Sequence, residues 1–161
     1  MHASQDHAPQ PWNPALAGEI IARHSGTQGA LLPLLHDLQD VFGCVPEAAV
    51  PLVAHALNLS RAEVHGVVTF YHDYHRTPQG AHVVKLCQAE ACQSMGSRDL
   101  ARHVQQRLGV ALGGTTADGR ITSQAVYCLG LCATAPSAMV DGRVVGRVTP
   151  ARMDKLLEAL S

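Results

Sequence analysis

Hydrophobic residues recur along this chain with two different periods, and the change comes near residue 80. Before it, apolar side chains return every three or four residues, which is typical of amphipathic helices. Short amphipathic helices joined by short loops favour an all-α bundle, expected over residues 13–76. Residues 1–12 show no period and are expected to be a mobile tail. The spacing predicts four helices: one from Asn13-Pro14, one over about 29–42, one from Pro46, and one that follows Ser60.

The ends of the predicted helices carry their own local signals. Gly43 is expected to end the second helix. Ser60 and Glu63 have the spacing of a capping box, in which each side chain bonds to the backbone of the other residue. Pro51 lacks the amide hydrogen that a helix interior needs, so the third helix should be kinked there or start late.

Beyond residue 80 the pattern alternates between strands and helices. The predicted elements are a strand over 82–87, a helix capped by Ser97, a strand over 121–128, a hairpin around Gly142 and a helix from Thr149-Pro150. Strand, helix, strand, hairpin and helix is the thioredoxin-like order, expected over residues 81–161. The expected fold class is therefore α/β, with an N-terminal four-helix bundle in front of a thioredoxin-like domain.

Composition excludes two broad classes of protein. Hydrophobic residues make up 47% of the 161 residues and charged residues only 16%, which excludes a disordered, highly charged chain. No apolar run approaches the roughly 18 residues that a membrane span needs. The N-terminal residues lack the charged and apolar regions of a signal peptide. We therefore expect a cytoplasmic protein with no membrane span.

Charge is distributed unevenly along the chain. The net charge is −1, so there is no general attraction to nucleic acid, and no nucleic-acid partner is expected. Residues 1–80 hold three basic and seven acidic side chains, whereas residues 81–161 hold nine and six. This difference favours two parts with different surfaces.

Four of the five cysteines fall in two tight pairs, which we call the four-cysteine site: Cys87, Cys92, Cys128 and Cys132. Each pair begins at the C-terminal end of a predicted strand and continues into the loop beyond it. If those strands are neighbours in one sheet, the two loops emerge side by side and four sulfurs can converge. In a reducing compartment, such clustered cysteines indicate metal ligands or redox groups.

Three chemistries compete for the four-cysteine site. A structural zinc ion also takes four thiolates, although its cysteine pairs are usually separated by two residues. A dithiol oxidoreductase would need Cys-x-x-Cys at the start of a helix, and that motif is absent. A [2Fe–2S] cluster takes two thiolates on each of two irons and accepts the longer spacings found here. The spacing favours the cluster over zinc, and over four cysteines that merely pack.

Three sequence motifs resemble a known family. They are Gly66-Val67-Val68-Thr69-Phe70-Tyr71, the first cysteine pair, and Cys128-Leu129-Gly130-Leu131-Cys132-Ala133-Thr134-Ala135-Pro136. Over about residues 31–160 the chain resembles the thioredoxin-like [2Fe–2S] subunits of NADH dehydrogenases. That family includes the small subunit beside the flavin subunit of respiratory complex I, and counterparts in NAD-reducing hydrogenases. Within it, residues 89–93 and 127–132 most resemble the gamma subunit of soluble, molybdenum-containing, NAD-dependent formate dehydrogenases.

The resemblance implies a non-catalytic electron-transfer subunit with no substrate site of its own. One [2Fe–2S] cluster would be held by the four-cysteine site, while FMN and NAD would bind to a partner subunit. The implied partners are that flavin- and NAD-binding subunit and a molybdenum-containing catalytic subunit. The host could instead be an NADH:quinone oxidoreductase or an NAD-reducing hydrogenase, and a zinc-stabilised adaptor without redox function is the alternative of another class. Cys44 lies outside the motifs and is expected to be a partly buried structural thiol.

Overall fold

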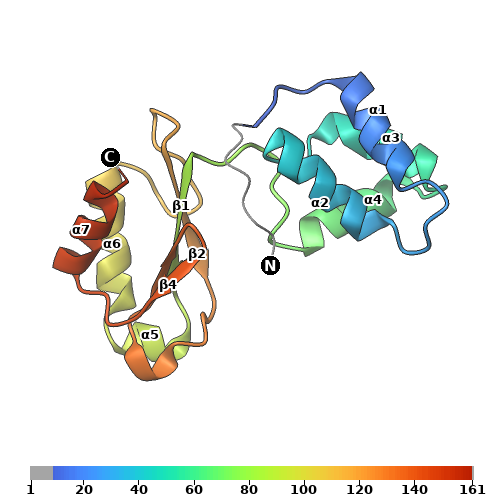
Figure 1. Cartoon of the computed structure of the whole chain (residues 1–161). Helices are drawn as coiled ribbons and strands as arrows, with labels where there is room; N and C mark the ends of the chain where they lie inside the picture. The colour runs from blue at the N-terminus through green and yellow to red at the C-terminus, as the bar shows by residue number, and fades with distance from the viewer. Residues whose placement is uncertain (1–8, 161) are drawn as a thin grey trace. The chain divides into compact units, whose positions relative to one another are not determined.

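The computed structural model describes residues 9–160 and divides the chain into two compact units between Pro78 and Gln79. The first unit is helical, and the second combines helices with a four-stranded sheet (Figure 1). Among the described residues, no helix has the length and apolar character to cross a membrane.

The described part of the N-terminal unit contains four α-helices and one 3-10 turn. Their side chains share one hydrophobic core, to which each α-helix contributes residues that are fully or almost fully buried, such as Ile20, Leu35, Val53 and Val64. That these helices pack as a regular four-helix bundle stays a prediction. The elements are α1 (Pro14–Arg23), α2 (Leu31–Phe42), η1 (Glu47–Ala49), α3 (Val50–Ala56) and α4 (Arg61–Phe70).

The helix ends follow the local signals of the sequence. Asn13 caps α1 through its side-chain oxygen, and Gly43 ends α2 with a φ of 71°. The capping box of Ser60 and Glu63 is formed at the start of α4. The turn η1 precedes α3, so Pro51 falls in the first turn of that helix, where its missing amide hydrogen has no helical partner to lose. The prediction of a late start is confirmed.

The last residues of the predicted tail, which was expected over residues 1–12, are attached to the helical unit. The first eight residues of the tail lie outside the described residues. The Gln10 N–H donates to the Val41 carbonyl oxygen at 2.9 Å, and the ring centroids of Trp12 and Phe42 are 5.1 Å apart. The last four residues of the predicted tail are therefore ordered against α2, because an aromatic contact and a backbone hydrogen bond hold them there.

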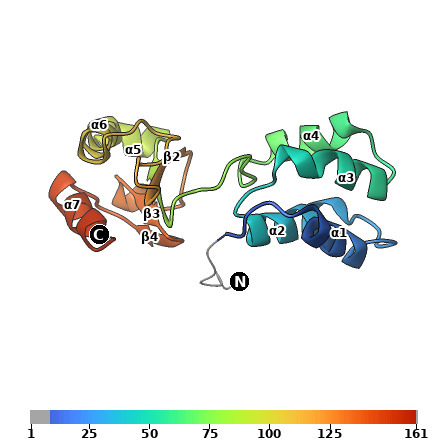
Figure 2. The ribbon, with the colours of Figure 1, turned by 90° about the horizontal axis from the view of Figure 1, so that it is seen from above.

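The C-terminal unit is built on a sheet with strand order β2-β1-β3-β4. Strand β1 pairs in parallel with β2 and antiparallel with β3, and β3 forms a hairpin with β4. Helices α6 and α7 lie side by side on one face of this sheet (Figures 1 and 2). The elements are β1 (His82–Cys87), α5 (Glu90–Ser94), α6 (Ser97–Leu108), β2 (Ile121–Val126), η2 (Cys132–Thr134), β3 (Ala138–Val140), β4 (Arg143–Val145) and α7 (Pro150–Glu158).

The core of this unit lies between the sheet and the two helices. Val84 and Leu86 of β1, Val104 of α6 and Met153 of α7 are all buried there. Successive side chains of a strand point to opposite faces of the sheet, and in β1 Val84 and Leu86 share the face that is covered by the helices. The mixed α/β class and the thioredoxin-like order of elements are confirmed.

The start of α6 differs from the prediction. Gly96, with a φ of 90°, is the residue before the helix, and Ser97 is the first residue within it. The Ser97 hydroxyl is buried without a hydrogen-bond partner, so it does not cap the helix. The short helix α5 was not predicted, because five residues are too few for a helical period to show.

Candidate functional site

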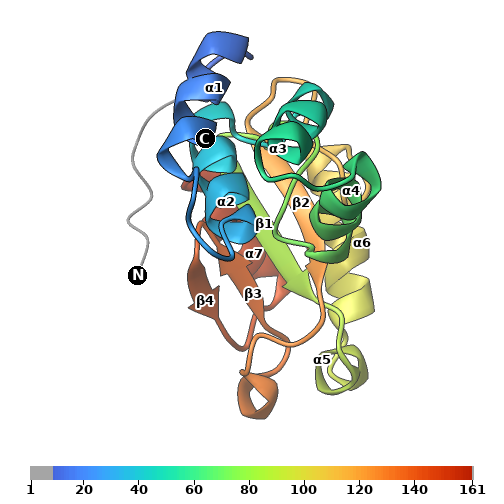
Figure 3. The ribbon, with the colours of Figure 1, turned by 90° about the vertical axis from the view of Figure 1, so that its right-hand side faces the viewer.

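The topology of the sheet brings the two cysteine pairs to one place. Strands β1 and β2 are parallel neighbours, and Cys87, the last residue of β1, lies opposite Val126, the last residue of β2. Both strands therefore end at the same edge of the sheet. Beyond this edge lie α5, which carries Cys92, and the turn η2, which begins at Cys132 (Figures 1 and 3). The predicted adjacency of the two loops is confirmed.

The first cysteine pair is buried. Cys87 is 2% exposed and Cys92 is 1% exposed. Burial acts to raise the pKa of the Cys87 thiol, but hydrogen bonds outweigh it and hold the pKa below its ordinary value. The donors are the backbone of Ala89, the backbone of Cys128, and the side chains of Cys92 and Ser137. A sulfur with so many donors is stabilised as a thiolate, and one of the donors belongs to the loop that carries the second pair.

The second cysteine pair is exposed. The Sγ atoms of Cys128 and Cys132 lie 3.8 Å apart, and the Gly130 N–H donates to Cys128 Sγ at 3.4 Å. The hydrogen bond with Cys128 and the charge of that residue raise the pKa of Cys132, with smaller contributions from Cys92 and Cys87. The charges of the first pair thus contribute to the raised pKa of Cys132 in the second.

The backbone of the second loop is unusual at two positions. Cys128 has a φ of 90° and Gly130 a φ of 76°. A Cβ added at Gly130 would meet no atom within 4 Å, so the glycine is required by its conformation and not by crowding. A non-glycine residue at positive φ costs about 1–3 kcal/mol and persists only where its surroundings hold it. This conformation ends β2 at Val126, two residues before the predicted end of the strand.

Two residues near the site, Ser137 and Met95, were missed at the level of sequence, and a third, Tyr127, entered only as part of a motif. Ser137 is 1% exposed, and its Oγ lies 3.4 Å from Cys92 Sγ. Met95 follows the helix that carries Cys92, and Tyr127 precedes Cys128; the two side chains are 60% and 77% exposed. Only the position of Ser137, one residue after the cysteine-proline motif, could have drawn attention to it.

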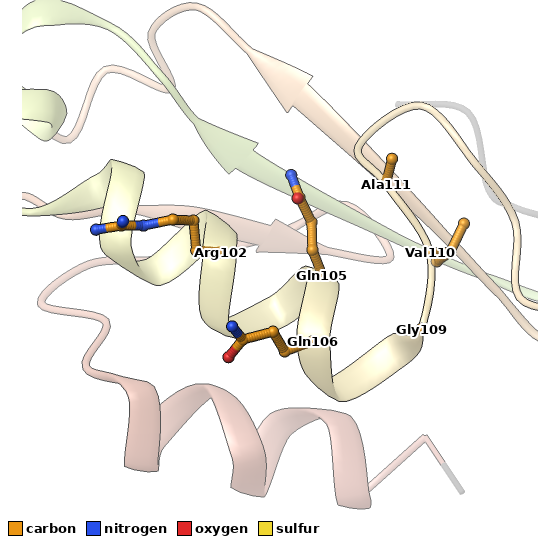
Figure 4. A pocket seen from close by; sticks show the side chains of 6 residues that line it. All are labelled: Arg102, Gln105, Gln106, Gly109, Val110 and Ala111. Atoms are coloured by element: carbon orange, nitrogen blue, oxygen red, sulfur yellow. The ribbon is translucent and has the colours of Figure 1, made fainter.

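Two other features do not belong to the four-cysteine site. Cys44 belongs to the helical unit and is buried there, more fully than the partial burial expected, and this burial raises the pKa of its thiol. Its structural role stays a prediction. A hollow of about 320 Å³ lies beside the C-terminal half of α6 (Figure 4). It is lined by Arg102, Gln105, Gln106, Gly109, Val110 and Ala111 and contains no cysteine.

The donor set of the four-cysteine site fits a binuclear cluster. Within residues 9–160 no three or more His, Cys, Asp or Glu side chains are grouped to hold one metal ion. The sulfurs come instead as two pairs, and backbone N–H groups of both loops point at them. A [2Fe–2S] cluster takes two thiolates on each iron and is stabilised by hydrogen bonds to sulfur.

Fold and site together define a thioredoxin-like iron–sulfur protein. The chain belongs to the thioredoxin-like [2Fe–2S] ferredoxin family, whose profile matches residues 17–161. Family membership confirms the predicted cofactor, one [2Fe–2S] cluster.

Relatives of known name share most of the chain. It is 39% identical to a subunit of the NADH-quinone oxidoreductase of Pseudomonas aeruginosa over 132 residues, which cover 82% of this chain and 80% of that protein. It is 35% identical to the HndA subunit of the NADP-reducing hydrogenase of Solidesulfovibrio fructosivorans, covering 81% of this chain and 76% of that protein. In a crystal structure of an NAD⁺-reducing [NiFe]-hydrogenase, one chain matches 81% of this protein with a TM-score of 0.67 and 27% identity. The match spans 22% of that hydrogenase chain.

Proposed function

We propose that this chain is the electron-transfer subunit of an NAD-dependent oxidoreductase, with the four-cysteine site as its [2Fe–2S] ligands. The observation that carries the proposal is the meeting of two cysteine pairs beyond one edge of the sheet. A hydrogen bond from the Cys128 backbone helps to lower the pKa of Cys87, which supports an approach of the second loop to the first cysteine pair.

The residues of the site have separable roles in this proposal. When bound, the cluster accepts and releases one electron at a time. The four thiolates supply ligands, and backbone N–H groups such as that of Gly130 stabilise negative charge on sulfur. Burial of Cys87 and Cys92 keeps water from one side of the site. Strands β1 and β2 hold the two loops at a fixed separation.

The partner in this proposal carries the flavin. Hydride exchange with NAD⁺ involves two electrons, so a one-electron carrier must work against a cofactor that can split a pair. We assign FMN and the NAD site to a partner subunit. Support comes from the relatives, which are named as subunits of an NADH-quinone oxidoreductase and an NADP-reducing hydrogenase.

For the host complex we propose a soluble, cytoplasmic NAD-dependent formate dehydrogenase with a molybdenum-containing catalytic subunit. The support is the resemblance of residues 89–93 and 127–132 to the gamma subunits of those enzymes. The names of the relatives favour the second candidates, an NADH:quinone oxidoreductase and an NAD-reducing hydrogenase.

The cluster is tested on the purified full chain. We expect a red-brown protein with about two irons and two acid-labile sulfides per chain, and an electron-paramagnetic signal after reduction. A colourless protein that contains zinc and no sulfide would contradict the proposal and support the zinc-stabilised adaptor.

The host is tested on the native complex. The chain is tagged at its own locus, and the purified complex is assayed with formate and NAD⁺, with NADH and quinone, and with hydrogen and NAD⁺. Formate-dependent NAD⁺ reduction by a complex that contains molybdenum is the expected result. Either of the other two activities without it would assign the chain to that host.

A further inference from the structure

Ser137 lies against the buried cysteine pair. It stands between Pro136 and β3, and its side chain is 1% exposed. Its Oγ is 3.4 Å from Cys92 Sγ, and a hydrogen bond from its side chain helps to lower the pKa of Cys87. The Cys87 N–H donates to the Ser137 carbonyl oxygen at 3.0 Å, which fixes the residue beside β1. One hydroxyl thus lies against the sulfur of Cys92 and acts on the pKa of Cys87.

We propose that Ser137 is a positioning residue that raises the reduction potential of the cluster by donating its O–H to the sulfur of Cys92 or Cys87. The inference rests on the proposed ligand role of the four-cysteine site. A sulfur that binds iron carries no proton, so the serine hydroxyl is the donor and the sulfur is the acceptor.

The direction of the effect follows from charge. Two ferric ions, two sulfides and four thiolates carry a net charge of about −2, and one added electron makes it about −3. The electron comes from the flavin of the partner subunit, one ferric ion becomes ferrous, and no bond to Ser137 forms or breaks. A hydrogen bond to the more negative state is stronger, so the hydroxyl favours the reduced cluster. Because Ser137 is buried, water does not replace the lost donor.

The chain offers a matched control for removal of a buried hydroxyl. Ser123 of β2 is fully buried, and its Oγ has no hydrogen-bond partner. It lies opposite Val84 in the sheet, three residues before the register position of Cys87. Replacing it with alanine therefore removes the same group without touching a cysteine.

The experiment measures the midpoint potential of the cluster in the full chain. We expect Ser137→Ala to lower the equilibrium constant for one-electron reduction about tenfold, a shift of about 59 mV for one electron. Ser137→Thr, which keeps the hydroxyl, and Ser123→Ala should both stay near the wild-type potential. Pulsed electron-paramagnetic spectra in D₂O should show one exchangeable proton coupling lost in Ser137→Ala alone. An unchanged potential in Ser137→Ala would overturn the proposal.

Measuring whether the cluster assembles distinguishes a failure of this inference from a failure of the proposed function. A wild-type chain without iron and sulfide would contradict the proposed function itself. If Ser137→Ala fails to assemble a cluster, Ser137→Gly is the second variant that lacks the hydroxyl. A potential lowered in Ser137→Gly and retained in Ser137→Thr supports the role of the hydroxyl. A wild-type potential in Ser137→Gly overturns it.

Discussion

Gly146 packs against the turn that carries Cys132, and it has no room for a side chain. A Cβ at this position would overlap Thr134 Oγ1 and lie 2.8 Å from Thr134 Cβ and 2.9 Å from its carbonyl oxygen. Two of these three atoms belong to the backbone or its first side-chain carbon, so a rotamer change cannot relieve the clash. The Arg147 N–H donates to that carbonyl oxygen at 2.6 Å, which holds the two segments together.

Replacement of Gly146 by alanine should therefore destabilise the C-terminal unit and displace η2. Overpacking of this kind costs about 1–3 kcal/mol. In a domain of 60–100 residues, each kcal/mol lowers Tm by about 4–8 °C, so the expected fall is roughly 4–24 °C. The displacement of Cys132 should also make the cluster easier to lose.

Unfolding of the two units can be followed by two different spectroscopic signals. Its single tryptophan, Trp12, packs on Phe42, so tryptophan fluorescence reports the helical unit. The visible circular dichroism of the cluster reports the C-terminal unit. Gly146→Ala should lower the midpoint of the visible transition and leave the fluorescence transition unchanged.

A second glycine supplies the control. Gly18 lies within α1, is exposed, and would present an added Cβ to open space. Gly18→Ala should stabilise the helix by about 1 kcal/mol and raise the fluorescence transition only. A visible transition in Gly146→Ala at the wild-type midpoint would refute the argument from the Thr134 clash.

The remaining predictions test the ligands, the reactivity and the response to acid. Serine at any member of the four-cysteine site should abolish or strongly alter the electron-paramagnetic signal, whereas Cys44→Ser should leave it intact; the reverse pattern would contradict the assignment. The isolated chain should be reduced by a strong chemical reductant but not by NADH or formate, and direct reduction by NADH would reveal a nucleotide site. Hydrogen bonds from Ser60 hold the pKa of Glu63 below its ordinary value, so its contribution to stability is complete above the unfolded-state pKa. That contribution should disappear as pH falls through the lower folded-state pKa. In acid titrations followed by Trp12 fluorescence, Glu63→Gln should lack this loss of stability.

The parts of the fold that the sequence predicts well depend on neighbouring residues. The capping box at Ser60 and the helix start at Asn13-Pro14 each need only a few adjacent residues, and both are formed. The alternation in β1 and the helical period of α6 likewise express one buried face each. The position of each cysteine pair at the end of a strand predicted that the two loops emerge side by side if the strands are neighbours, and β1 and β2 are parallel neighbours.

The parts that were missed depend on contacts between distant segments. Trp12 orders the residues before α1 because Phe42 is 30 positions further along the chain. Ser97 has the residue type of a cap, but its hydroxyl is buried on the face of α6 that packs on the sheet. The contact between Ser137 and Cys92 joins residues 45 positions apart. No local pattern carries such information.

The same division runs through the four-cysteine site itself. The ligand type can be recognised from the sequence because only cysteine supplies a thiolate, which is the usual ligand of a [2Fe–2S] cluster. The hydrogen bonds that stabilise the sulfurs come largely from the backbone of Ala89, Cys128 and Gly130, and a backbone N–H is present in every residue except proline. What directs them is conformation, including the positive φ of Cys128, which a residue with a Cβ adopts only under the constraint of the whole fold. The sequence can therefore name the cluster, while the electrostatics that set its potential emerge only in three dimensions.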